Sequence, residues 1–251
     1  MTTQETTLNG EMQPSWKLLL GIIDRPTATF KAVLARRIWW TWALPLLVLL
    51  LCFVVMTVVS TPYTLELARQ QAERQLQTMP PEQAEAARAT MSTFVSLPFI
   101  MATGLGIGAL MLVLGTVAQA AILYFGALVA GGEVEFGPVF TVSTWTRLPL
   151  AIGMLVRAAF TAFAGRLVQY PGLATLVATG DLSTDGRNPL VALLGQLELF
   201  WLWHLVLVAL GVAVVARFSR TKAVVITLIY AVISLAAVAI PSLLFGGFSG
   251  G

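Results

Sequence analysis

Two ionisable side chains lie inside one of the most apolar stretches of the sequence. Glu198 and His204 both fall within residues 197–211, and nearly all the remaining residues of this stretch are hydrophobic. Arg157 lies in the preceding apolar stretch and carries the charge opposite to that of Glu198. Charged groups in such stretches generally pair with one another or mark a path for ions or protons. Because Arg157 and Glu198 would lie at similar depths in two antiparallel helices, we predict that they form an intramembrane ion pair.

His204 and Gln119 are the polar residues that could extend this pair into a path. His204 follows Glu198 by six residues and so lies on a different helix face, where we expect a neutral imidazole bonded to a backbone carbonyl or a hydroxyl. Arg147 is expected near the cytoplasmic interface, which its long side chain can reach. A transporter or channel subunit that uses Arg157, Glu198 and His204, with Gln119, therefore stays open as an alternative function.

Recognisable catalytic motifs are missing from the sequence. The chain has a single histidine and a single cysteine, which cannot build a metal site rich in these ligands, and it has no phosphate-cradling glycine loop. Residues 247–251 match Gly-x-Ser-x-Gly by letters, but a nucleophile at Ser249 would need a following helix, and only two residues follow it. We therefore expect a protein without a catalytic site, a metal or a cofactor.

The composition points to a membrane protein. Hydrophobic residues make up 57% of the chain and charged residues only 11%, whereas soluble domains carry about 25% charged residues. The net charge of +3 comes largely from basic residues beside hydrophobic runs, which is typical of cytoplasmic flanks of membrane spans. The expected surroundings are a lipid bilayer, and nucleic acid is not an expected partner.

Five apolar stretches reach the length of about 20 residues that a membrane-spanning helix needs. We predict an all-α membrane protein, a bundle of five transmembrane helices over residues 38–251. An amphipathic cytoplasmic leader over residues 1–37 is expected to lie in the membrane interface. The polar segment 62–96 is predicted to form an exoplasmic helical loop, interrupted at Pro80-Pro81. The spans are expected near residues 38–60, 98–130, 141–165, 190–216 and 223–245.

Basic residues near the ends of the spans predict the orientation. They precede the first span and fill the link between the fourth and the fifth, so both segments should be cytoplasmic. This gives a multi-pass protein of the plasma membrane with a cytoplasmic N-terminus and an exoplasmic C-terminus. The basic residues used here are Lys17, Arg25, Lys31, Arg36, Arg37, Arg217, Arg220 and Lys222.

The second span carries a small-residue pattern. Gly104 and Gly108 have the four-residue spacing that allows two helices to approach closely. This spacing indicates packing within the chain, and it leaves open self-association or a contact with a partner helix.

Several single residues and residue pairs, which we call positional marks, occur in a characteristic order along the whole chain. They are Pro26 and Phe30 in the leader, Gly131, Gly132 and Phe136 after the second span, Leu148 and Pro149 in the third, Leu199, Trp203 and Gly211 in the fourth, and Lys222 and Ala223 at the start of the fifth. In this combination the chain resembles the Ypt-interacting-protein (Yip) domain family in its bacterial form.

This resemblance implies a polytopic helical membrane protein without a known catalytic site. Eukaryotic members act in vesicle traffic and contact small GTPases, but their Asp-Leu-Tyr-Gly-Pro type of motif is absent here, so that role is not carried over. Some bacterial relatives are associated with ABC-type export systems. The resemblance therefore leads us to expect a non-enzymatic accessory or organising factor for other membrane components, such as an export complex.

Overall fold

The computed structural model describes residues 15–36 and 38–246, and this part of the chain is helical and contains no β-strand. Ser249 and Arg37, which the sequence analysis singled out, lie outside these residues. The helices are α1 (Ser15–Asp24), α2 (Pro26–Leu34), α3 (Trp40–Gln77), α4 (Pro81–Phe94), α5 (Leu97–Val129), α6 (Phe136–Thr146), α7 (Leu148–Ala164), the 3-10 turn η1 (Ala174–Leu176), α8 (Leu182–Asp185), α9 (Pro189–Gln196), α10 (Leu199–Val215) and α11 (Arg220–Gly246).

Long apolar helices dominate the described residues. Four of them are long and apolar enough to cross a membrane, namely α3, α5, the continuous unit of α6 and α7, and α11, and a fifth span results if α9 and α10 are counted together. The predicted all-helical membrane class is therefore confirmed. Lipid accounts for the many large hydrophobic side chains that the fold leaves exposed along these helices, such as Leu110, Met111 and Leu228.

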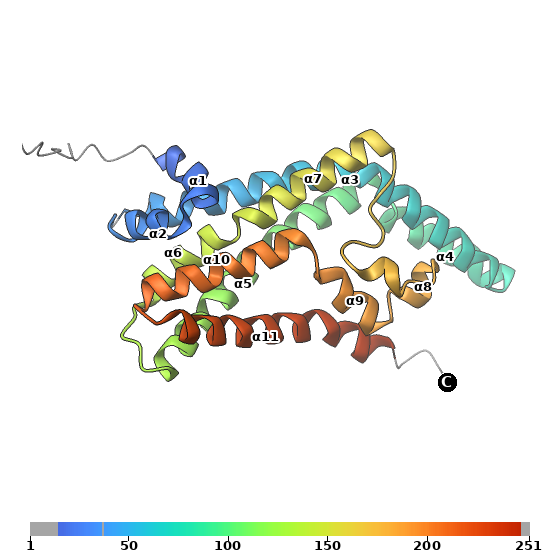
Figure 1. The fold of residues 1–251 in the computed structure, drawn as a ribbon. Coiled ribbons are helices and arrows are strands. Elements are labelled where there is room, and N and C mark those ends of the chain that lie inside the picture. Colours follow the sequence, from blue (N-terminus) through green and yellow to red (C-terminus); the bar gives the residue numbers. More distant parts are fainter. Residues whose placement is uncertain (1–14, 37, 247–251) are drawn as a thin grey trace, which may run out of the picture.

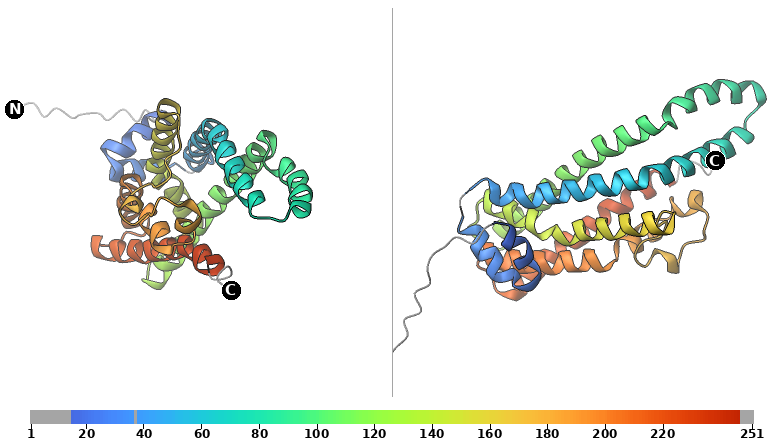
Figure 2. Two further views of the ribbon diagram at one scale, coloured as in Figure 1. Left: turned by 90° about the vertical axis from the view of Figure 1, so that its right-hand side faces the viewer. Right: turned by 90° about the horizontal axis from the view of Figure 1, so that it is seen from above.

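The long helices run side by side, as Figure 1 shows. Helices α1 and α2 lie at one end of the bundle, together with the turns α5–α6 and α10–α11, and we call this the α1 end. The segment that joins α7 to α9 lies at the opposite end. There α3 continues into α4, and the resulting hairpin projects beyond the other helices (Figure 2). Spans that follow one another along the chain therefore run in opposite directions, whereas the packed helices α3 and α7 run in the same direction.

Two helices extend beyond the bounds predicted for their spans. Helix α3 does not stop near residue 60 but continues through Pro62 to Gln77, so the first part of the predicted helical loop is continuous with the helix of the first span. Its neighbouring Thr61 hydroxyl donates to the Thr57 carbonyl at 2.6 Å, and hydroxyls of this kind help helices to accommodate proline in membranes. The third span begins at Phe136 rather than near residue 141, because α6 leads into α7 through a single turn residue, Arg147.

The fourth predicted span, near residues 190–216, consists of two helices rather than one. Helices α9 and α10 meet at a 64° bend, where Glu198 has an extended backbone and precedes the first turn of α10. The loop before α8 packs against this break, and the Leu173 N–H donates to the Leu194 carbonyl at 2.9 Å. The Leu194 carbonyl also accepts from the Leu197 N–H at 3.1 Å, so the loop adds a second hydrogen bond at the end of α9.

The leader helices are docked into the bundle. Phe30 and Val33 of α2 are fully enclosed, and together with Ile22 of α1 they join a core cluster with Val142 and Leu207. The same helix α1 leaves Trp16, Leu20 and Ile23 exposed. An interfacial position accounts for this exposed apolar side, but the predicted interfacial leader overlooked the docking of the opposite side.

Candidate functional site

Gln119 and His204 meet in a polar network inside the bundle. The Gln119 Nε2 donates to the Thr146 hydroxyl at 2.9 Å. His204 Nδ1 lies 2.7 Å from the Thr146 carbonyl oxygen, and its Nε2 lies 3.1 Å from the Tyr230 hydroxyl. Side chains from α5, α6, α10 and α11 thus converge at one level. His204 and Gln119 are 0% and 1% exposed, so this network is closed to solvent.

Arg147 completes the network, contrary to its expected position at the interface. Its Nε donates to Gln119 Oε1 at 2.8 Å, and its Nη2 donates to the Gly115 carbonyl at 2.7 Å. The guanidinium lies close to the backbone here, since a Cβ on Gly115 would be 3.6 Å from Arg147 Nη2, an ordinary van der Waals contact. Both acceptors are neutral, and among the described residues Arg147 forms no salt bridge with a carboxylate. Hydrogen bonding therefore replaces the counter-charge that a buried cation usually needs.

Arg157 and Glu198 lie in contact between α7 and the start of α10. The Arg157 Nη2 is 3.1 Å from Glu198 Oε1, and the two side chains are 30% and 18% exposed. Arg157 Nε is buried without a hydrogen-bond partner, so Glu198 is the main group that compensates this guanidinium. The bend at the start of α10, rather than a position within a continuous helix, places the carboxylate here.

The pair and the network are separate. No hydrogen bond among the described residues connects Arg157 or Glu198 with His204, Gln119 or Arg147. A relay of protons needs a continuous chain of ionisable or hydroxyl groups. The polar residues thus form two local ties between helices.

Gly104 and Gly108 face helix α3. A Cβ on Gly104 would lie 3.4 Å from the Thr57 methyl group, and a Cβ on Gly108 would collide with the Phe53 ring. The pattern therefore lets α3 and α5 approach within the chain, where a larger residue would separate them.

The positional marks of the sequence concentrate where helices contact one another. Gly211 of α10 lies against Phe30 and Val142, and a Cβ there would collide with Val142. Pro26 occupies the first turn of α2, Pro149 is buried in the first turn of α7, and Trp203 packs beside the core cluster that contains Phe30.

The remaining marks surround the turn between α5 and α6. Gly131 has a φ of +80°, which glycine adopts without strain. A Cβ on Gly132 would lie 2.6 Å from the Phe218 ring, so this glycine lets the turn contact the α10–α11 link. The Phe136 ring packs against Tyr124 at 5.8 Å between centroids. These marks hold the geometry of the bundle.

The sequence analysis missed a cluster of hydrogen bonds around the carboxylate of Asp185, which we call the clasp. It lies at the end opposite to the α1 end. Asp185 is 2% exposed and accepts hydrogen bonds from the Tyr170 hydroxyl at 2.6 Å and from the N–H of Thr179 and of Gly180. The donors come from a loop before α8, so neither charge nor periodicity signals their convergence. The turn-forming residues at 179–181 were the feature of the sequence that could have indicated this site.

The clasp predicts a pH-dependent stability. The Thr179 N–H, with Tyr170, holds the pKa of the Asp185 carboxyl below its usual value of about 3.9. Its stabilising effect should therefore be complete above pH 4 and be lost as the pH falls through the lowered pKa. The bond to Asp185 also raises the pKa of Tyr170 to about 12, so its contribution should fade as alkaline pH approaches that value.

Melting curves of the wild type and of Asp185→Asn in detergent between pH 3 and 8 test this prediction. The melting temperature of the wild type should exceed that of the variant at neutral pH, and the two should converge in acid. Tyr170→Phe is the matched control, because it removes one donor and keeps the carboxylate. A difference between wild type and Asp185→Asn that does not change with pH would contradict a titrating clasp.

The arrangement as a whole supplies contacts between helices. No group of three or more His, Cys, Asp or Glu residues that could hold a metal occurs in the described part of the chain. At the two intramembrane sites the polar side chains bond to one another or to the backbone, with Arg157 Nε left without a partner. What the fold and these sites define is a helical membrane protein whose spans are tied together by interior polar contacts.

The chain belongs to the Yip1 domain family. The model of the Yip1 domain matches residues 20–240, which include α2 to α10, half of α1 and most of α11. Comparison with curated proteins and with solved structures gave no match.

Proposed function

We propose that this protein is a non-enzymatic accessory or organising factor that acts by contact with other membrane proteins, such as the components of an export complex. The observation that carries the proposal is that the interior polar groups are shielded from solvent. Gln119 and His204 have almost no exposed surface and are bonded within the bundle. Membership of the Yip1 domain family supports the same proposal, because the family is not known for catalysis.

The proposed topology has five spans in the plasma membrane, with α9 and α10 forming one bent span. The N-terminus would be cytoplasmic and the C-terminus exoplasmic. Lys31, Arg217 and Lys222 all lie at the α1 end (Figure 1), and an excess of such residues is typical of the cytoplasmic side. The exposed and stacked rings of Trp39 and Trp40, 4.0 Å apart between centroids, lie at the same end, where aromatic residues favour the headgroup level.

The projecting hairpin is the surface that we propose for partner contact. Helix α4 has no buried residue, although residues 82–88 are all good helix formers. Its exposed Glu82, Glu85 and Arg88 give it a polar surface outside the apolar bundle. A partner of an export system, or a second copy of this chain, could bind there without entering the bilayer.

A transporter or channel subunit is less well supported. That function would use Arg157, Glu198 and His204 as a hydrated path. The ion pair and the His204 network are not connected by hydrogen bonds in the described residues, and His204 is completely enclosed. A path through them would require the helices to separate.

Capture from native membranes tests the proposed function. The protein should be purified in mild detergent after incorporation of a photo-crosslinking residue at Glu85 in α4. Leu176, which is 75% exposed and lies at the same end of the bundle, is the matched control position. We expect defined membrane proteins to be crosslinked from Glu85 and not from Leu176. Reproducible recovery of the chain alone, without any crosslinked partner, would contradict an organising role.

A further inference from the structure

A basic pocket opens at the α1 end of the bundle. It has a volume of about 620 Å³, which falls in the range of about 300 to 1,000 Å³ that small-molecule sites occupy. Residues from α2, α3, α6 and the α10–α11 link form its walls. Those that matter here are Lys31, Arg36, Trp39, Trp42, Glu135 and Arg217.

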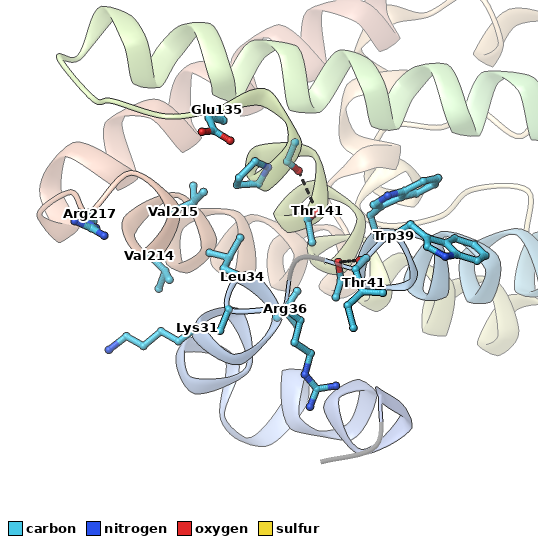
Figure 3. Close-up of a pocket in the computed structure, with 16 residues that line it drawn as sticks. Lys31, Leu34, Arg36, Trp39, Thr41, Glu135, Thr141, Val214, Val215 and Arg217 are labelled. Atoms are coloured by element: carbon cyan, nitrogen blue, oxygen red, sulfur yellow. Dashed lines mark hydrogen bonds between the residues drawn. The ribbon is translucent and has the colours of Figure 1, made fainter. Parts of the chain in front are cut away.

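The pocket gathers positively charged side chains. Figure 3 shows Lys31 and Arg217 along one rim, with Trp39 on another side. Both cations are exposed, and within the described part of the chain neither forms an ion pair with a carboxylate. Glu135, the acidic residue of the pocket, is placed to accept hydrogen bonds from hydroxyl groups of a ligand. The chemistry fits a phosphate that carries a hydroxylated group.

The backbone of Arg217 supplies an independent observation. Arg217 has a φ of +53° and is the non-glycine residue with positive φ among the described residues. It occupies the left-handed position that ends α10, where the Phe218 N–H returns to the Ala213 carbonyl at 3.1 Å. Glycine is the usual residue at this position. An arginine retained in a strained conformation indicates a use for its side chain.

The level of the pocket in the membrane identifies the source of the phosphate. Trp39 and Trp42 are exposed beside the pocket at the start of a spanning helix, and such rings favour the headgroup region. Basic pockets between spanning helices bind anionic headgroups. We propose that this pocket binds the headgroup of an anionic phospholipid, with Lys31 and Arg217 on the phosphate and Glu135 on headgroup hydroxyls.

Native mass spectrometry of the detergent-purified protein tests this site, with dioleoyl phosphatidylglycerol as the probe and dioleoyl phosphatidylcholine as the neutral lipid. Arg217→Gly should weaken phosphatidylglycerol binding about fivefold, as expected for one cation near an anionic headgroup, and leave phosphatidylcholine binding unchanged. Its melting temperature should equal or exceed that of the wild type, because glycine adopts positive φ freely. Lys31→Gln should produce a similar loss of phosphatidylglycerol binding.

Arg220→Gln is the matched control, since Arg220 is an exposed arginine three residues further on and does not line the pocket. It should bind phosphatidylglycerol like the wild type. An equal loss in Arg220→Gln, or no loss in Arg217→Gly, would overturn the site. Glycerol 3-phosphate separates the two sources of phosphate: if it raises the melting temperature of the wild type and displaces phosphatidylglycerol, the ligand is a soluble phosphate and the lipid assignment is wrong.

Discussion

Replacing Glu198 by glutamine should lower the free energy of unfolding by about 3 kcal/mol, because the change leaves the Arg157 guanidinium without its counter-charge. The Arg157 Nε is already buried without a partner, so no nearby acceptor can take over. Arg157→Met should have a similar effect by leaving the carboxylate uncompensated. We expect the lower end of the usual range of about 3 to 5 kcal/mol, since the two side chains are 30% and 18% exposed.

The double variant Arg157→Met with Glu198→Leu removes both charges and should recover much of the loss, because apolar groups often replace a buried ion pair without cost. Denaturant titration of the wild type, both single variants and the double variant in mixed micelles gives the coupling energy. The Asp24–Arg25 pair is the control. Its side chains are 76% and 80% exposed, so Asp24→Asn should change stability by less than about 1 kcal/mol. Strictly additive losses would show that Arg157 and Glu198 do not interact.

The positions of the spans could be read from the sequence because length and apolarity decide them. Helix α5 runs over Leu97–Val129, close to the predicted 98–130, and α11 covers the predicted fifth span. The break before Leu199 could not be predicted from length and apolarity. Neither Leu197 nor Glu198 is a glycine or a proline, which would have indicated a break. The break depends on contacts with residues distant in sequence, including the loop around Gly172. This loop approaches so closely that a Cβ added at Gly172 would lie 2.8 Å from the Leu197 carbonyl oxygen.

The polar sites likewise include one contact that the sequence predicted and one that it did not. Charge type and depth within the spans suggested the contact between Arg157 and Glu198. The inward position of Arg147 depends on Gln119, which lies 28 residues earlier in the chain, and on the carbonyl of Gly115. No local pattern reports such a partner. Proximity to a span end therefore gave the wrong surroundings for Arg147.

A second large effect is expected at Gln119, whose Oε1 accepts from Arg147 Nε at 2.8 Å and from the Tyr230 hydroxyl at 3.4 Å. Gln119→Leu preserves much of the volume but leaves the guanidinium without this acceptor and the Thr146 hydroxyl without its donor. Removing the hydrogen-bond partner of a buried charged donor costs about 3 kcal/mol. Gln119→Glu, the matched control, keeps an acceptor beside Arg147 and adds a counter-charge, so most of the stability should be retained.

The free energies of unfolding of Gln119→Leu, Gln119→Glu and the wild type, measured in the same mixed micelles, test most directly whether the interior polar residues tie the helices together. We predict a loss of about 3 kcal/mol or more for Gln119→Leu, and a value for Gln119→Glu within about 1 kcal/mol of the wild type, because the new carboxylate pairs with Arg147. A Gln119→Leu variant as stable as the wild type would contradict a structural network and return Gln119, Arg147 and His204 to consideration as a path across the membrane.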